Sequence, residues 1–219
     1  IEGGSTAALV GHSGAGKSTI TNNLISIYRE KGKKVAVIAV DPTSPFSGGA
    51  LLGDRIRMTS HYSDPNVFIR SMATRGGKGG LSIKSQEASE VFDAAGFDIV
   101  IYETVGVGQI ELDVMQASDT VVVVLVPESG DEVQMLKAGL MEIGNIFAIN
   151  KADRPGANKF MTALNNIMIN DNMEGDAWVQ KVVSTIATEN KGTRDMYTAI
   201  ESHKTYIYAQ GIQKEKMDE

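Results

Sequence analysis

An octapeptide near the start of the chain carries the residue types that bind phosphate groups. It runs Gly11-His12-Ser13-Gly14-Ala15-Gly16-Lys17-Ser18 and fits the spacing G-x-x-x-x-G-K-[ST]. In this spacing the glycines let backbone N–H groups turn around the α- and β-phosphates, the lysine reaches the β- and γ-phosphate oxygens, and the serine hydroxyl ligates Mg²⁺. We therefore expect nucleotide contacts from Ser13, Gly14, Ala15, Gly16, Lys17, Ser18 and Thr19.

The residues on either side of this loop supply the setting that the loop requires. The apolar run 7–10 predicts a buried strand, and residues 17–30 predict a helix with Ile20, Leu24, Ile27 and Tyr28 on one face. A chance glycine-rich turn is the alternative, and the bare pattern arises by accident in roughly one chain of this length per hundred. The strand before the loop and the helix after it favour a phosphate loop.

A second polar motif follows another apolar strand, about 130 residues after the phosphate loop. Residues Asn150-Lys151-Ala152-Asp153 match N-K-x-D. An aspartate at the last position accepts hydrogen bonds from both N1–H and the 2-amino group of guanine, and adenine has neither donor there. Each such bond is worth about 1.5–3 kcal/mol, so losing both discriminates by more than about a hundredfold. A solvated turn is the alternative. Downstream, we expect the backbone N–H of Ala187 to meet guanine O6.

Three carboxylates are candidates for a magnesium site near the phosphates: Asp41, Asp54 and Glu103. Mg²⁺ with a bound nucleotide takes one or two carboxylates together with phosphate oxygens and water. Glu103 opens a stretch E-x-x-G where nucleotide hydrolases usually have D-x-x-G, and Gly106 then donates its N–H to the γ-phosphate. Two alternatives stay open, because Asp41 could cap the turn before Pro42 and Asp54 could pair with a neighbouring arginine.

The chain alternates between strand-like and helix-like segments, which predicts an α/β fold. Strands are expected at 7–11, 34–40, 67–71, 98–103, 120–126, 146–150 and 181–185, and helices at 17–31, 83–95, 132–141, 158–169 and 193–210. Several strands are continuously apolar, which a strand needs when both faces are covered. We therefore expect a mostly parallel central sheet of about seven strands with helices on both faces, and ligands at the carboxyl ends of the strands.

Composition narrows the function classes. With 219 residues, 42% of them hydrophobic, the chain is expected to form a single domain over 1–219, without the terminal extensions of a longer parent. A net charge of −6 opposes nucleic acid or an anionic membrane as the main partner. The absence of cysteine excludes disulfides and fits the cytoplasm, or the mitochondrial matrix in a eukaryote. Trp178 is expected to pack rather than to stack on a base.

Three longer segments resemble the MeaB/ArgK family: 40–58, 103–109 and 127–134. These proteins are P-loop GTPases of the SIMIBI class that serve as chaperones for adenosylcobalamin-dependent acyl-CoA mutases. The resemblance implies GTP or GDP and Mg²⁺ as ligands, and a metal site built from Ser18, Asp41, Asp54 and Glu103. It implies a switch that responds to nucleotide and partner, with Asp131, Glu132, Gln134 and Lys137 in it. The implied partner is such a mutase, separate or fused, with a possible homodimer in the full-length parent.

The expected hydrolysis is slow without a partner, with Lys17, Glu103 and Gln109 as catalytic residues. Many small GTPases carry a water-orienting glutamine directly after the D-x-x-G glycine, but this chain has Val107 there. Gln109 would have to swing inward. Two other functions compete with a mutase chaperone. A GTPase that inserts nickel into enzymes predicts a Cys/His cluster, and the chain has no cysteine. A P-loop kinase predicts tolerance of ATP, which Asp153 opposes.

Overall fold

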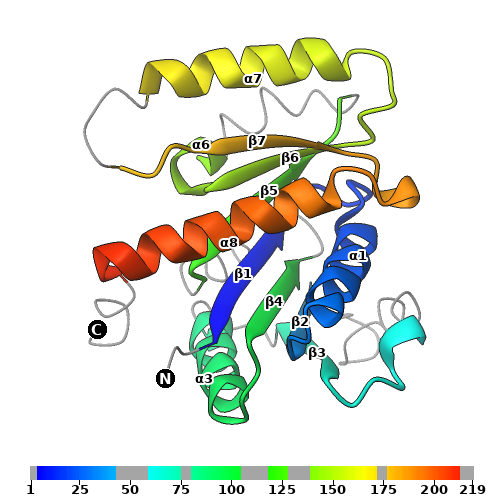
Figure 1. The fold of residues 1–219 in the computed structure, drawn as a ribbon, viewed down its shortest axis with the longest axis vertical. Helices are drawn as coiled ribbons and strands as arrows, with labels where there is room; N and C mark the ends of the chain where they lie inside the picture. Colours follow the sequence, from blue (N-terminus) through cyan, green and yellow to red (C-terminus); the bar gives the residue numbers. More distant parts are fainter. Residues whose placement is uncertain are drawn as a thin grey trace.

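Seven parallel strands form one central sheet (Figure 1). The computed structural model describes residues 4–42, 59–74, 80–104, 118–127, 139–171 and 177–212. The strand order is β3-β2-β4-β1-β5-β6-β7. Their bounds are β1 Ser5–Val10, β2 Val35–Pro42, β3 Val67–Thr74, β4 Ile99–Thr104, β5 Thr120–Leu125, β6 Ile146–Asn150 and β7 Lys181–Thr185. The predicted α/β class and strand number are confirmed.

Helices cover both faces of this sheet. They are α1 Lys17–Glu30, α3 Gly80–Ala94, α6 Leu140–Ile143, α7 Ala157–Asp171 and α8 Thr193–Gln210, with 3₁₀ turns η1 Thr59–His61 and η2 Ala187–Glu189. Helices α1 and α8 pack on one face of the sheet, and α3, α6 and α7 pack on the other. The helix expected at 132–141 lies mostly outside the described residues, which include only its last positions and α6.

The alternation of side chains along β1 explains why its sequence is apolar throughout. Ala7 and Leu9 belong to the core under α1 and α8, whereas Ala8 and Val10 belong to the core on the opposite face. All four side chains are almost completely buried. A strand covered on both faces loses the polar alternation of a half-exposed strand, as the sequence predicted.

Several predicted strand ends differ from the structure, and three of them, in β1, β2 and β3, do so for identifiable reasons. Gly11 was expected to end the first strand, but β1 ends at Val10. Gly11 has φ 148°, and a Cβ atom there would overlap the carbonyl oxygen of Val124, so only glycine fits this close approach. At the outer side of the sheet, β2 and β3 run on past their predicted ends, because Asp41 pairs with Ala73 and Pro42 with Thr74.

An aromatic cluster lies between α8 and the segment that leads into β7. The Trp178 ring lies 4.6 Å from the His203 ring and 5.5 Å from the Tyr206 ring, measured between centroids. Its indole N–H donates to the backbone carbonyl of Asn145 at 3.0 Å. His203 is buried, and its Nδ1 lies 2.9 Å from the Thr120 hydroxyl. Trp178 is half-buried in this cluster, and the expectation that it packs against the protein is confirmed.

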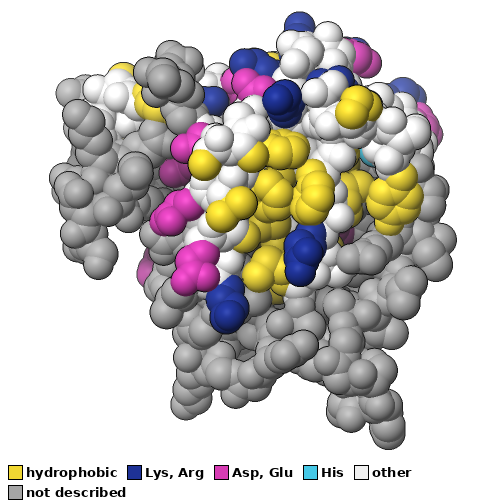
Figure 2. Space-filling model, turned by 90° about the horizontal axis from the view of Figure 1, so that it is seen from below, with side chains coloured by type: hydrophobic (Ala, Val, Ile, Leu, Met, Phe, Trp, Pro, Cys, Tyr) yellow, Lys and Arg dark blue, Asp and Glu magenta, His cyan; other side chains and the backbone are white. Residues whose placement is uncertain are grey.

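A partly exposed apolar surface lies where α3 meets β3. Phe68 on β3 and Val91 on α3 are 43% and 65% exposed, and the Phe68 ring packs on Phe92 at 5.3 Å between centroids. Figure 2 looks at this side of the molecule and shows apolar side chains with acidic ones along one margin. Contiguous apolar surface of this kind is a common feature of protein contact surfaces.

Among the described residues, no helix combines the length and apolarity needed to cross a bilayer.

Candidate nucleotide-binding site

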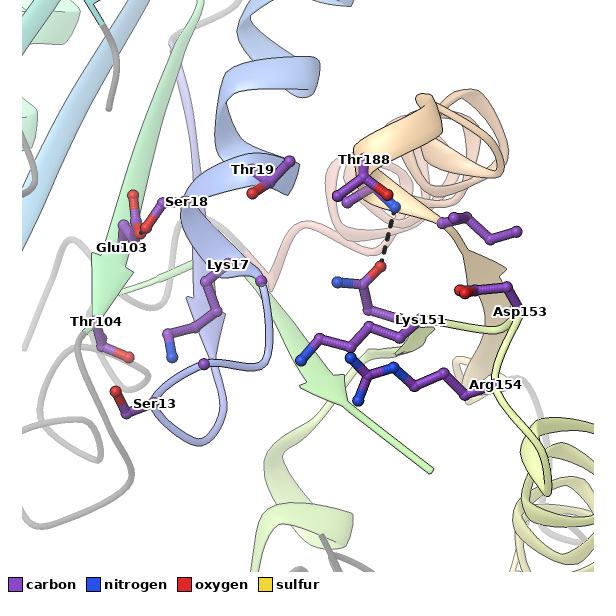
Figure 3. A pocket seen from close by; sticks show the side chains of 15 residues that line it. Ser13, Lys17, Ser18, Thr19, Glu103, Thr104, Lys151, Asp153, Arg154 and Thr188 are labelled. Carbon is purple, nitrogen blue, oxygen red and sulfur yellow. Dashed lines mark hydrogen bonds between the residues drawn. The ribbon is translucent and has the colours of Figure 1, made fainter. Parts of the chain in front are cut away.

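A cavity of about 450 Å³ opens at the carboxyl ends of the strands. Four segments line it: the phosphate loop with the start of α1, the end of β4, residues 150–154, and residues 186–188. Figure 3 shows Ser13, Lys17, Ser18, Glu103 and Thr104 on one side, with Lys151, Asp153, Arg154 and Thr188 on the other. Its volume falls in the usual range for small-molecule sites, about 300–1,000 Å³. The two predicted motifs therefore line one cavity.

The phosphate loop is held in a tight turn directly before α1. The backbone N–H of Ala15 donates to the carbonyl of His12 at 3.1 Å, and Gly16 caps α1 with φ 95°. This left-handed conformation favours glycine. A Cβ atom at Gly16 would also overlap the side-chain amide of Asn150, so the loop can approach Asn150 only because residue 16 has no side chain. The second glycine of the motif is thus required by packing as well as by phosphate binding.

Lys17 is buried within the phosphate loop that it follows. Its side chain is only 5% exposed, and its Nζ donates to the carbonyls of Gly11 at 2.6 Å and His12 at 2.9 Å. These bonds hold the ammonium group at the wall of the cavity, on the side of the phosphate loop (Figure 3). A fixed positive charge at this place suits the β- and γ-phosphate oxygens of a nucleotide.

Two predicted metal ligands lie in direct contact. The Ser18 hydroxyl donates to Oε1 of Glu103, and Glu103 is only 5% exposed. A hydroxyl and a carboxylate oxygen are the ligand types that Mg²⁺ prefers, so this pair fits the proposed ion. The backbone of Asp41 lies just beyond Val40, which pairs with Thr104 of β4. In the part of the chain that the structure describes, no group of three or more acidic or histidine side chains is arranged around a metal position.

Asn150 connects the two halves of the cavity. Its side chain is almost completely buried, and its Nδ2 donates to the Ala15 carbonyl at 2.8 Å. Its Oδ1 accepts from the Thr185 hydroxyl and from the Ala187 N–H, each at 3.1 Å. These contacts use three of the four hydrogen bonds that an asparagine side chain can make. Asn150 therefore braces the phosphate loop against the end of β7. Within the residues that the structure describes, its second amide N–H has no acceptor and is available to a nucleotide.

The residues after Asn150 form a tight turn that presents Asp153 to the cavity. Lys151 has φ 57°, a left-handed conformation that is uncommon outside glycine and is often held at functional sites. Two backbone bonds fix the turn, from Ala152 N–H to the Thr185 carbonyl at 3.1 Å and from Arg154 N–H to the Lys151 carbonyl at 3.0 Å. Asp153 is exposed and lines the cavity, as its predicted contact with a base requires.

Ala187 borders the same end of the cavity, but its N–H already has an acceptor in Asn150. Guanine O6 would have to share this N–H with Asn150 Oδ1. The carbonyl of Ala187 accepts a hydrogen bond from the side chain of Asn23 at 2.8 Å. The predicted contact between Ala187 and O6 stays a prediction.

Replacing Asn150 with alanine is expected to loosen both halves of the site. Three hydrogen bonds are lost and the buried carbonyl of Ala15 keeps no side-chain donor, so we expect the free energy of unfolding to fall by about 2–4 kcal/mol. Nucleotide affinity should fall for guanine and adenine diphosphates alike. Urea unfolding and calorimetric titration measure both effects. Thr162→Ala, which removes an exposed hydroxyl on α7, serves as the control, and equal stability of the two variants would contradict the bracing role.

Several predicted site residues lie outside the described part of the chain: Asp54, Gly106, Gln109, Asp131, Glu132, Gln134 and Lys137. Conversely, the cavity wall includes Thr104, Arg154 and Thr188, which the motifs did not single out. Each is a direct sequence neighbour of a predicted residue, so extending each motif by one position would have found them. Asn23 had no comparable signal, because a polar residue inside a helix usually faces solvent.

The sequence matches the family model described as methylmalonyl Co-A mutase-associated GTPase MeaB over residues 3–219. The chain belongs to the MeaB family. A putative GTPase of Pyrococcus abyssi is 51% identical over 213 residues, which cover 95% of this chain and 65% of that protein. GTPase ArgK of Escherichia coli is 38% identical over 93% of this chain and 62% of its own length. This MeaB-family chain thus spans less than two thirds of the length of these relatives.

A mouse protein named methylmalonic aciduria type A homolog, mitochondrial, is 34% identical over 93% of the chain and 50% of that protein. Among solved structures, LAO/AO transport system kinase superposes with a TM-score of 0.76 and 28% identity, over 99% of this chain and 64% of that one. HypB of Helicobacter pylori in complex with nickel has a TM-score of 0.55 over 93% of this chain and 88% of that one. At 17% identity, the similarity to HypB shows only that HypB and this MeaB-family chain share a fold.

Proposed function

We propose that this MeaB-family chain is a GTP-binding and GTP-hydrolysing molecular switch. The observation that carries the proposal is the single cavity lined by both the phosphate loop and the N-K-x-D segment. The phosphate loop has the lysine and serine that β- and γ-phosphates and their metal need, and Asp153 borders the opposite end, where a base would lie. The similarity to proteins named GTPases supports the same activity.

In this proposal the hydrolytic residues come from three segments of the chain. Lys17 binds the β- and γ-phosphate oxygens and stabilises the negative charge that develops during transfer to water. Ser18, together with Glu103, Asp41 and Asp54, would hold Mg²⁺ directly or through water, and a bound ion would supply positive charge against the phosphates. Gly106 senses the γ-phosphate through its N–H, and Gln109 orients the attacking water.

Asp153→Asn is expected to change which base the protein selects. The Asp153 carboxylate accepts hydrogen bonds from two donors of guanine. The asparagine amide can accept only one of them and places its own NH₂ donor against the other, so GDP affinity should fall about 100-fold. Xanthosine diphosphate should bind the variant more tightly than GDP, because the xanthine O2 can accept from the new amide. Calorimetric titration with GDP, ADP and xanthosine diphosphate measures this change.

Asp195→Asn, an exposed substitution of the same chemistry in the first turn of α8, should leave all three affinities unchanged. If wild-type protein bound ADP as tightly as GDP, guanine selection would be wrong and a P-loop kinase would become the better hypothesis.

The partner that we propose is an adenosylcobalamin-dependent acyl-CoA mutase of the methylmalonyl-CoA type, either separate or fused. The family description, which names a mutase-associated GTPase, supports this choice. The chain would act as a chaperone that gates cofactor loading or protects the loaded mutase. A nickel-insertion role has less support, since the chain lacks cysteine and its likeness to HypB is one of fold. Phosphate release with and without such a mutase tests the partner.

A further inference from the structure

Helix α1 is linked directly to the loop at the base end of the cavity. Asn23 lies in the second turn of α1, and its Nδ2 donates to the carbonyl of Ala187 at 2.8 Å. The two residues are 164 positions apart in the sequence. The bond is partly buried, so solvent competes with it less than with a surface contact. Helix α1 therefore does more than carry the phosphate loop at its first turn.

This bond closes a ring of contacts that runs through both ends of the site. From Ala187 the N–H donates to Asn150, and Asn150 donates to the Ala15 carbonyl in the phosphate loop. Ala15 leads through Gly16 into α1, which carries Asn23 back to the Ala187 carbonyl. Ala187 is thus held on both sides, by Asn150 at its N–H and by Asn23 at its carbonyl. The Ala187 carbonyl also accepts from the backbone N–H of Asn190 at 3.2 Å, which holds it within its own 3₁₀ turn, so the bond from Asn23 is the one that ties this turn to α1.

The fixed orientation matters because the two purine bases differ at this end of the cavity. Guanine carries the acceptor O6, whereas adenine carries an amino group that donates. The Ala187 N–H, which O6 would share with Asn150 Oδ1, favours the acceptor and opposes the donor, but a turn that shifts relative to the phosphate loop moves that N–H away from the base. We propose that Asn23 is a positioning residue for base selection, which keeps the loop at Ala187 in register with the phosphate loop. This inference rests on the guanine site proposed above.

Three nucleoside diphosphates separate positioning of the loop from a general loss of binding. GDP has both O6 and the 2-amino group, IDP keeps O6 and lacks the 2-amino group, and 2-aminopurine riboside diphosphate keeps the amino group and lacks O6. For Asn23→Ala we expect affinity for GDP and for IDP to fall about tenfold, the size of one hydrogen bond of about 1.4 kcal/mol. Affinity for 2-aminopurine riboside diphosphate should change less than about twofold, because this nucleotide has no O6 and therefore makes no contact through O6 that the variant could lose.

Two further variants complete the experiment. Asn23→Asp keeps the shape of the side chain but places a carboxylate against the Ala187 carbonyl, so its loss for GDP should equal or exceed that of Asn23→Ala. Asn22→Ala is the matched control, because its side chain accepts from Ser60 at 3.2 Å instead of contacting Ala187. It should bind all three nucleotides as wild type does.

Calorimetric titration gives the affinities, and thermal unfolding of each variant confirms that it is folded. Equal losses for all three nucleotides, or Asn23→Ala indistinguishable from Asn22→Ala, would overturn the positioning role while leaving guanine selection intact. Wild-type protein that binds ADP as tightly as GDP would instead overturn the proposed guanine site, and the role of Asn23 with it.

Discussion

Lys17→Ala is expected to lower the single-turnover rate of GTP hydrolysis by on the order of 10³-fold and to weaken GTP binding strongly. The wild-type ammonium is held at the phosphate loop by two backbone carbonyls, so its charge is already in position before the nucleotide binds. Water cannot supply a fixed charge in the space that alanine leaves. Phosphate release in a single turnover, measured at saturating GTP, reports the rate.

The fold should survive this substitution, because the core under α1 is built by Ile20, Leu24 and Tyr28 rather than by Lys17. Circular dichroism and thermal unfolding check this point. Lys31→Ala, at the exposed end of the same helix, is the control that removes a positive charge without touching the loop. Hydrolysis by Lys17→Ala at the wild-type rate would show that the assigned role of Lys17 is wrong.

Much of the fold could be predicted because a parallel sheet leaves strong marks in the sequence. Continuous apolar strands such as β5 and a long amphipathic helix such as α8 depend on local pattern alone, and α8 was predicted with the bounds that the structure has. The ends of β2 and β3 were placed too early, because their last residues are held by pairing between strands and carry no local signal.

The site was predictable to the extent that its chemistry sits in contiguous motifs. The phosphate loop and N-K-x-D were found from spacing, and the structure places both at one cavity. The bracing role of Asn150 was missed, because its partners Ala15, Thr185 and Ala187 are distant in the sequence. The contact between Asn23 and Ala187 was missed for the same reason. Hydrogen bonds between residues so far apart in the sequence arise from the fold, and no motif spacing in the sequence predicts them.

The second large expected effect is acceleration of GTP hydrolysis by the proposed mutase. The chain has Val107 where many small GTPases orient water with glutamine, and valine can neither orient nor polarise water. Groups that position water and stabilise charge are worth on the order of 10³–10⁵ in rate. We expect the mutase to supply that factor by favouring an active conformation of residues 106–111 and 127–137.

Substitutions in these two segments should reduce the acceleration. Gln109→Ala removes the proposed water-orienting amide, and Asp131→Ala removes a carboxylate of the proposed partner switch. Each should lower the mutase-stimulated rate by at least about tenfold. Glu142→Ala, an exposed acidic residue on α6, provides the control and should be stimulated as strongly as wild type.

The most direct test of the central claim is the rate of phosphate release from GTP by wild-type protein, measured with and without a purified adenosylcobalamin-dependent acyl-CoA mutase. The same assay with ATP shows whether turnover depends on the base. A partner-activated GTPase predicts slow release from GTP alone, a large increase on addition of the mutase, and negligible release from ATP. Fast release that the mutase does not change, or equal release from ATP, would contradict the account.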